Sequence, residues 1–285
     1  MKWALLGSTA LITVAANGAA MAADLGQRAP AMPVKAPVAV APPFNWTGFY
    51  VGPVVGYSWR DPSINFTGNA AAQATFLSTG VVPNSIPVDP KGFLGGLQTG
   101  FNFQAGMAVF GFETDFSYAN IHDGGTAGPG LDYVFLCGKF CTAKFTSSAD
   151  QKLDRFGTVR ARFGLTPVEQ LLLFVTGGFA YGHANLNASV LNVTATQFFP
   201  TIPLPPCTQL CAAGSTSQWL TGWTAGFGAE YAFTRFWSVK VEYLYYDLGH
   251  LSVSFFDPRF AAFVFNADAI YRGHIARLAL SFKLP

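Results

Sequence analysis

Four cysteines are the residues with the most specific chemistry in this chain of 285 residues. Cys137 and Cys141 form one C-x3-C pair, and Cys207 and Cys211 form a second. In an exported protein an even number of cysteines favours disulfides. Three pairings are open, and proximity along the chain favours Cys137–Cys141 and Cys207–Cys211. A four-cysteine zinc site is the alternative, which an oxidising compartment disfavours. We therefore predict disulfides, no metal and no cofactor.

The histidines do not form a recognisable catalytic set along the chain. Nucleophilic catalysis needs a serine or cysteine next to a base that an acid orients. His183 has Ser189 nearby, and His250 has Ser252, but neither spacing belongs to a known motif. His122 and His274 likewise lack a neighbouring serine and acid in a recognisable pattern. The sequence predicts that the protein is not an enzyme.

Eight charged residues occupy every second position of segments that are otherwise apolar or small. Successive side chains of a β-strand point to opposite faces, so these charges share one face of their strands. Because buried charges are tolerated only in pairs, we expect four bases to face four acids in a closed interior. The predicted network consists of Arg160, Arg162, Lys240 and Arg277 with Glu113, Asp115, Glu230 and Glu242.

The segments that carry the two-residue alternation define the elements that must position these charges. There are eight: Trp46–Trp59, Gly92–Gln104, Ala108–Tyr118, Phe156–Leu165, Leu171–Gly182, Trp219–Phe233, Trp237–Leu248 and His274–Phe282. The pattern is weakest in the fifth, because Leu172 and Phe174 fall on the parity of the charges.

The composition indicates that the face opposite the charges meets lipid. The chain is 51% hydrophobic and 11% charged, whereas soluble domains carry about 25% charged residues. No apolar run after the first two dozen residues is long enough for a spanning helix, and only a closed barrel otherwise satisfies the backbone in lipid. We predict an all-β fold, a transmembrane antiparallel up-and-down β-barrel of eight strands. A soluble lipocalin-like barrel would instead place the charges in water.

Connections of two kinds alternate between the segments. The short connections are residues 105–107, 166–170 and 234–236. The long connections are residues 60–91, 122–152, 185–218 and 249–272. Outer-membrane barrels alternate short periplasmic turns with long external loops. We therefore expect four long external loops and both barrel ends on the periplasmic side.

Residues before the first strand are predicted to form a signal peptide and a lead-in to the barrel. Residues 1–22 combine Lys2, an apolar run and Ala20-Met21-Ala22, which suits signal-peptidase cleavage after Ala22. A transmembrane helix is the alternative. Residues 23–45 are rich in proline and alanine and predict an extended periplasmic lead-in. Residues 46–285 form the predicted barrel.

Several motifs in order resemble a known family. They are Trp46-Thr47-Gly48-Phe49-Tyr50-Val51-Gly52, Gly157-Thr158-Val159-Arg160-Ala161-Arg162, Thr176-Gly177-Gly178-Phe179-Ala180-Tyr181-Gly182 and Val241-Glu242-Tyr243-Leu244-Tyr245. Together they resemble the small eight-stranded outer-membrane barrels of alphaproteobacteria, which are similar to outer-membrane immunogenic proteins and to the OmpA-type barrel. The resemblance implies the cell outer membrane of a Gram-negative bacterium. It also implies outer-membrane lipid and lipopolysaccharide, periplasmic chaperones and the barrel-insertion machinery as partners. Members usually end on an aromatic residue, whereas this sequence continues past Phe282 to Lys283-Leu284-Pro285.

A filled barrel predicts a structural role. Eight strands enclose a space that side chains fill, so we expect a protein that supports envelope integrity and displays surface loops, with possible host or phage contacts. A narrow porin-like channel for ions or small solutes and a surface adhesin are the alternatives. A net charge of +2 without a basic patch predicts no nucleic-acid partner.

The predicted cleavage site can be tested directly. N-terminal sequencing of the protein from membranes is expected to begin at Ala23, because the small residues Ala20 and Ala22 fit the peptidase. Recovery of a chain that begins at Met1 would contradict the signal-peptide interpretation.

Overall fold

The computed structural model describes residues 44–60, 63–128, 141–198, 201–204 and 210–285. The predicted signal peptide, most of the lead-in, Cys137 and Cys207 lie outside these ranges. The division into signal peptide, lead-in and barrel therefore stays a prediction.

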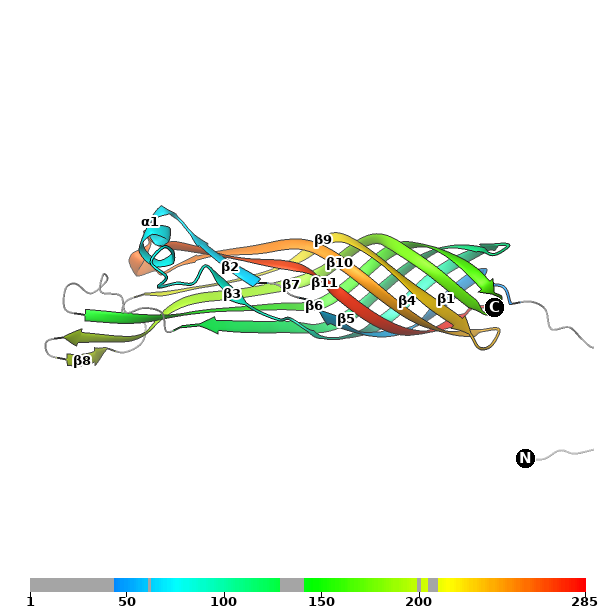
Figure 1. Ribbon diagram of the computed structural model, residues 1–285, viewed down its shortest axis with the longest axis horizontal. Helices are drawn as coiled ribbons and strands as arrows, with labels where there is room; N and C mark the ends of the chain where they lie inside the picture. Colours follow the sequence, from blue (N-terminus) through cyan, green and yellow to red (C-terminus); the bar gives the residue numbers. More distant parts are fainter. Residues whose placement is uncertain (1–43, 61–62, 129–140, 199–200, 205–209) are drawn as a thin grey trace, which may run out of the picture. The chain divides into compact units, whose positions relative to one another are not determined.

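Eight long antiparallel strands close into a barrel within the described residues (Figure 1). Neighbouring strands follow one another along the chain, and the ladder between the last strand and the first closes the ring, with Tyr57 opposite Ala276. This confirms the predicted up-and-down architecture. The strands in order are β1 (Gly48–Trp59), β4 (Gly92–Ala105), β5 (Ala108–Ala127), β6 (Cys141–Val168), β7 (Leu171–Phe198), β9 (Cys211–Ala232), β10 (Trp237–Phe256) and β11 (Val264–Lys283).

Short elements gather at the end of the barrel opposite the short turns. β2 (Ser63–Gly68) pairs with β11, β3 (Ser85–Pro87) pairs with β2, and β8 (Thr201–Leu204) pairs with β7. Between β2 and β3 lie α1 (Ala70–Ala72) and the π-helical turn η1 (Gln73–Leu77), and a 3-10 turn, η3 (Pro258–Phe260), follows β10. Among the described residues, no helix is long and apolar enough to cross a membrane.

The strands are much longer than the sequence predicts. β6 and β7 each have 28 residues, whereas about 9–11 residues cross a bilayer. The extra length comes largely from 122–152, 185–218 and 249–272, so the prediction that these segments are long loops was wrong for most of their residues. They alternate small polar residues outside with Ala188, Val190 and Ala212 inside, and the ladder continues through them, as in the pair of Ser148 and Ser189.

The interior consists of three layers along the barrel axis. An apolar cluster of Trp46, Val109, Leu172, Phe174 and Ala232 lies at the short-turn end. The charged residues come next. A larger core fills the remainder; it is mostly apolar and includes Leu153, Phe156, Tyr246 and Tyr271, with Phe76 of η1 at its far end. Arg60 is also buried there, with its guanidinium carbon 5.0 Å from the centroid of the Tyr271 ring. Apolar side chains therefore cover the charged layer from both sides.

Phe174 and Leu172, which weakened the pattern of the fifth segment, keep the inward parity. Both are buried, with 5% and 0% of their surface exposed. Gly164 and Gly228 lie opposite Phe174 on the two neighbouring strands. A Cβ atom on Gly228 would lie only 2.7 Å from the Phe174 ring, so these glycines make room for an inward aromatic ring.

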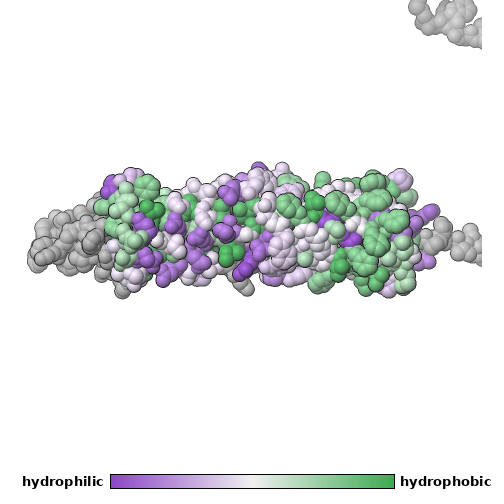
Figure 2. All heavy atoms as spheres, turned by 90° about the horizontal axis from the view of Figure 1, so that it is seen from above, coloured by the Kyte–Doolittle hydropathy of each residue, from purple (hydrophilic) through white to green (hydrophobic). Residues whose placement is uncertain are grey.

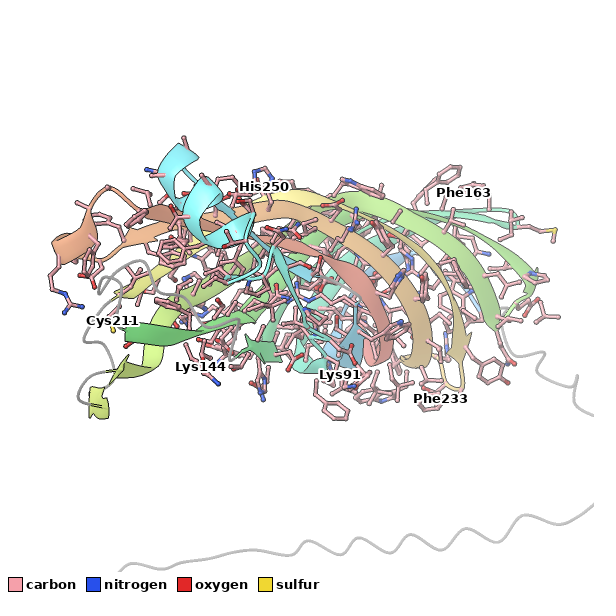
Figure 3. All side chains as sticks on the ribbon, turned by 60° about the vertical axis from the view of Figure 1, so that its left-hand side comes forward. Lys91, Lys144, Phe163, Cys211, Phe233 and His250 are labelled. Atoms are coloured by element: carbon pink, nitrogen blue, oxygen red, sulfur yellow. The ribbon has the colours of Figure 1, made fainter. Side chains whose placement is uncertain are left out.

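The outer face of the barrel is apolar near the short turns and polar further along the strands. Phe163 and Phe233 project from the surface near the short-turn end (Figure 3). Figure 2 shows hydrophobic residues gathered at that end and hydrophilic ones over the middle. We call the strand residues within 122–152 and 185–218 the strand extensions. Their outward residues include Ser148, Asp150 and Asn187. The apolar part has the outward face that lipid requires.

Truncating the inward ring tests the lower apolar layer. Phe174→Ala is expected to lower the free energy of unfolding by about 3–5 kcal/mol, because glycines on both sides cannot fill the cavity that the ring leaves. Urea unfolding in detergent micelles, followed by tryptophan fluorescence, measures the change. The control Val175→Ala shortens the neighbouring outward side chain and should lower the free energy of unfolding by less. Equal losses in the two variants would contradict the layered interior.

Candidate functional site: a buried charge layer

The structure places all eight of the charged residues singled out above in one layer inside the barrel. Each is at most 3% exposed. They come from β5, β6, β9, β10 and β11, so the layer crosses the interior from one wall to the other. Four acids and four bases are present, and their formal charges cancel.

Glu113 is the acid with the most contacts at the centre of the layer. Lys240 Nζ donates to its two carboxylate oxygens at 2.8 and 2.6 Å. Arg160 donates to Oε1, and the Tyr50 hydroxyl donates to Oε2 at 2.5 Å. Arg162 Nη1 lies 3.6 Å from the same Oε2. One carboxylate thus faces three cations.

Arg160 and Arg277 connect the remaining acids on one side of the barrel. Arg160 Nη1 lies 2.6 Å from Glu242 Oε1, and its Nη2 lies 3.2 Å from Asp115 Oδ2. Arg277 contacts the same two acids, at 2.5 Å to Glu242 Oε2 and 3.0 Å to Asp115 Oδ1. Each acid therefore bridges two guanidinium groups, which fixes the relative positions of β5, β6, β10 and β11.

Arg162 connects the charged layer to the apolar cluster below it. Its Nη2 donates to Glu230 Oε2 at 2.8 Å, and Ser238 donates to the other oxygen of Glu230 at 2.6 Å. The guanidinium carbon lies 4.2 Å from the centroid of the Phe174 ring. A cation over an aromatic face is attracted by the ring quadrupole, so Phe174 both closes the layer and stabilises its lowest cation.

Sequence reasoning missed several uncharged members of the layer. Tyr50 contacts Glu113 and also accepts from Arg162 at 3.0 Å. Thr158 donates to Asp115 at 2.5 Å. A usable signal was present for Tyr50, because it is a large polar residue on the inward parity between Gly48 and Gly52. Gly100 lies opposite Tyr50 in the ladder, and a Cβ there would lie 2.5 Å from the hydroxyl.

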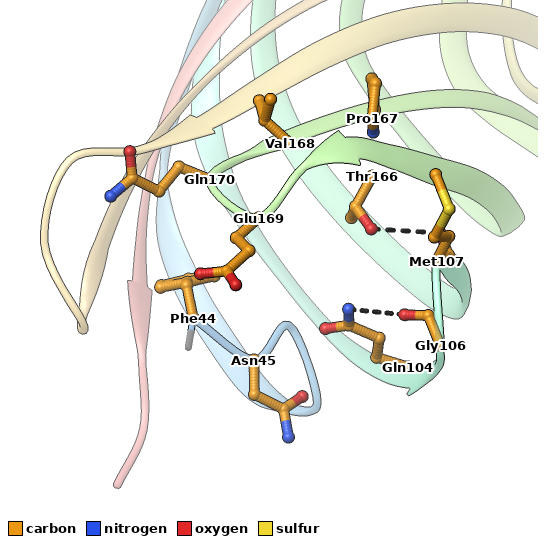
Figure 4. Close-up of a pocket in the computed structure, with 10 residues that line it drawn as sticks. All are labelled: Phe44, Asn45, Gln104, Gly106, Met107, Thr166, Pro167, Val168, Glu169 and Gln170. Carbon is orange, nitrogen blue, oxygen red and sulfur yellow. Dashed lines mark hydrogen bonds between the residues drawn. The ribbon is translucent and has the colours of Figure 1, made fainter. Parts of the chain in front are cut away.

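Trp46, the first residue of the opening motif, covers the short-turn end of the barrel. Its indole N–H donates to the carbonyl oxygen of Glu169 at 3.0 Å, and its backbone N–H donates to Gln104 Oε1 at 2.8 Å. The cleft between the two turns beside it is shown in Figure 4, where Thr166 donates to the carbonyl oxygen of Met107. Trp46 thereby links the chain entering the barrel to both neighbouring turns.

The predicted cysteine chemistry is tested only at one residue. Cys211 is disulfide-bonded, but the side chains of Cys137, Cys141 and Cys207 lie outside what the structure describes, so the pairing stays a prediction. The Cys211 backbone N–H donates to Asp257 at 2.7 Å. Hydrogen bonds from Arg259 and from this N–H lower the pKa of Asp257 to about 2. Within the described ranges, no three His, Cys, Asp or Glu side chains are grouped to hold a metal ion.

Comparison with known proteins identifies a family. The family model of the outer membrane protein beta-barrel domain matches residues 29–281. The 31 kDa outer-membrane immunogenic protein of Brucella melitensis is 33% identical over 99% of this chain and 100% of that protein. The 25 kDa outer-membrane immunogenic protein of Brucella abortus is 27% identical over 88% and 86%. The crystal structure of OprG from Pseudomonas aeruginosa covers 85% of this chain and 98% of its own, with 12% identity and a TM-score of 0.48.

Removing the central carboxylate tests the energetics of the layer. Glu113→Gln is expected to lower the free energy of unfolding by about 3–5 kcal/mol, because it leaves buried cations with one acid too few. The double variant Glu113→Gln with Lys240→Met should recover part of this loss, because the charges again cancel. Urea unfolding in micelles measures both.

A matched control for this variant is the exposed pair of Lys91 and Asp89. Lys91 Nζ lies 2.8 Å from Asp89 Oδ2, and more than half of each side chain is exposed. Asp89→Asn should leave stability unchanged, because water and salt screen exposed pairs. If Glu113→Gln were as mild as Asp89→Asn, the charged layer could not be a dry, paired network.

Proposed function

Since the chain belongs to the outer membrane protein beta-barrel family and lies in the outer membrane of a Gram-negative bacterium, we propose that it is a structural barrel. In this proposal the closed interior stiffens the envelope, and the long strand extensions present a surface to the outside. Lipid and lipopolysaccharide would surround the apolar face, and periplasmic chaperones and the insertion machinery would deliver the chain.

The observation that carries the proposal is the filled interior. All eight charges are paired and almost fully buried, with an apolar layer on either side. A channel for ions or small solutes needs a continuous file of water along its axis. A buried, charge-paired layer between two clusters of apolar side chains opposes that file, so the geometry favours a scaffold over the porin-like alternative.

The strand extensions support surface display as a second role. Four residues lie side by side at one level of the sheet, namely Gly124 of β5, Asp150 of β6, Asn187 of β7 and Ser215 of β9. These outward residues are small or polar, so this part of the sheet suits water and sugars better than lipid. Residues displayed on a rigid scaffold are well suited to recognition. Contact with a host cell or a phage would use this surface.

A trimmed barrel tests which part of the molecule supports the envelope. Gly124 lies opposite Asp150, Asp150 opposite Asn187, and Asn187 opposite Ser215. Replacing 125–149 and 188–214 by Asn-Gly turns therefore cuts both hairpins at one level. Because the charged layer remains, the trimmed variant should restore detergent resistance to a deletion strain as fully as the complete protein, measured as the minimal inhibitory concentration of a bile salt.

The complementary variant keeps the extensions and weakens the interior. Full-length Glu113→Gln should restore less resistance than the trimmed barrel, at equal amounts of heat-modifiable protein in the membrane. The opposite ranking, with loss of resistance on trimming and none on Glu113→Gln, would contradict the scaffold proposal and favour a function in the extensions.

A further inference from the structure

Three side chains from neighbouring strands form a hydrogen-bonded chain on the outer surface, outside the charged layer. Ser217 Oγ of β9 lies 3.1 Å from His183 Nε2 of β7, and His183 Nδ1 lies 2.8 Å from Asp154 Oδ1 of β6. We propose that Ser217, His183 and Asp154 form a serine nucleophile, its base and the acid that orients the base, and that this site cleaves acyl esters of membrane lipids.

The backbone brings these residues together through a β-bulge and one diagonal pair. Leu153 pairs with Ala184 and Arg155 pairs with His183, so Asp154 is the extra residue between them. Bulges re-aim a side chain and are frequent next to active sites. On the other side His183 pairs with Trp219, and Ser217, two residues earlier, is its diagonal neighbour on the same face.

The hydrogen bonds assign the state in which the site would act. A carboxylate only accepts, so the proton shared with Asp154 belongs to His183 Nδ1. In the ring form that carries only this proton, Nε2 is an acceptor and can take the hydroxyl proton of Ser217, 3.1 Å away. This is the arrangement by which a base activates a serine and an acid holds the base in the correct tautomer. The side chains of His183 and Asp154 are 21% and 30% exposed, so the pair is partly shielded, while Ser217 faces outward.

Asn185 is placed to stabilise the oxyanion that such a reaction forms. It lies directly opposite Ser217 in the ladder between β7 and β9. Its carbonyl oxygen accepts from Tyr271, but its side-chain amide has no partner among the described residues. An amide N–H₂ beside the nucleophile is a typical oxyanion donor.

The position of the site defines the class of substrate. The Trp219 ring lies 5.3 Å from the His183 ring and 6.2 Å from the Tyr181 ring, and Trp219 is exposed. Exposed tryptophan and tyrosine rings favour the headgroup level of a membrane. The acyl ester bonds of membrane lipids lie at that depth, between the headgroups and the chains, so a lipid ester can reach Ser217 while its acyl chain stays beside the apolar band.

The reaction follows from these placements in two steps. Ser217 Oγ attacks the ester carbonyl carbon while His183 Nε2 takes the hydroxyl proton, and the C–O bond to the alcohol breaks as His183 returns that proton to the leaving oxygen. Water then attacks the carbonyl carbon of the acyl-Ser217 ester while His183 Nε2 takes a proton from it, and the bond from that carbon to Ser217 Oγ breaks as His183 returns the proton to Oγ. A free fatty acid and the alcohol are the products, and no electron acceptor is needed.

Covalent labelling tests the nucleophile without any assumption about the lipid. The full-length protein in detergent micelles, verified as folded by heat-modifiable migration, is treated with a fluorophosphonate probe. Labelling at Ser217, located by peptide mass spectrometry, is the expected result. It should disappear in Ser217→Ala, fall at least 10²-fold in rate in His183→Gln, and persist in the control Ser215→Ala, which removes an outward serine two residues away. Absence of labelling from the folded wild-type protein, or equal labelling of Ser217→Ala, would overturn the proposal.

Turnover measurements then separate the role of Asp154 and the source of the ester. With p-nitrophenyl decanoate, Asp154→Asn should lower kcat with KM unchanged, and Asp154→Glu should recover part of kcat, because the acid acts through the orientation of His183. Release of fatty acid is measured from vesicles of phosphatidylethanolamine and from lipopolysaccharide micelles. Release from either supports the proposal and identifies the source. Failure to hydrolyse the decanoate and both lipids would contradict the assigned activity.

Discussion

Pairing of charge inside a closed ring of strands is the constraint on which the rest of this structure depends. A carboxylate or guanidinium removed from water costs several kcal/mol unless it is paired and hydrogen-bonded. Here Glu113, Arg160 and Glu242 each contact more than one opposite charge, so losing one partner affects the whole layer. Because the partners come from different strands, the same contacts that satisfy the charges also fix the shape of the barrel.

The apolar layers and the glycines follow from that constraint. Phe174 and Trp46 keep water away from the charges at one end, and the larger core does so at the other. The inward glycines Gly100 and Gly228 lie opposite the inward rings of Tyr50 and Phe174, because an eight-stranded barrel has no spare volume. Lipid imposes the complementary rule outside, where the strands must present apolar side chains and leave no edge unpaired.

Residue parity predicted much of this arrangement, and the remainder depended on contacts that a linear pattern does not contain. The alternation around Arg160 and Arg162 indicated both the strand and the inward face. It was misleading beyond Tyr118 and before Phe156, because the outward apolar signal stops where the lipid stops while the ladder continues. Ser217, His183 and Asp154 were not recognisable at all. They are separated by 34 and 29 residues, and the bulge that turns Asp154 toward His183 has no local sequence signal. A site assembled across three strands becomes visible only when the register is known.

The most direct test of the closed interior is the conductance of the folded, purified monomer in a planar lipid bilayer. Because the charges of the buried layer cancel and apolar side chains cover it on both sides, we predict no discrete conductance steps at any applied potential of either sign. Recovery of heat-modifiable protein from the same membranes verifies that the protein has inserted. Stable, ion-selective steps that change in Glu113→Gln would show that ions pass through the charged layer and would contradict this account.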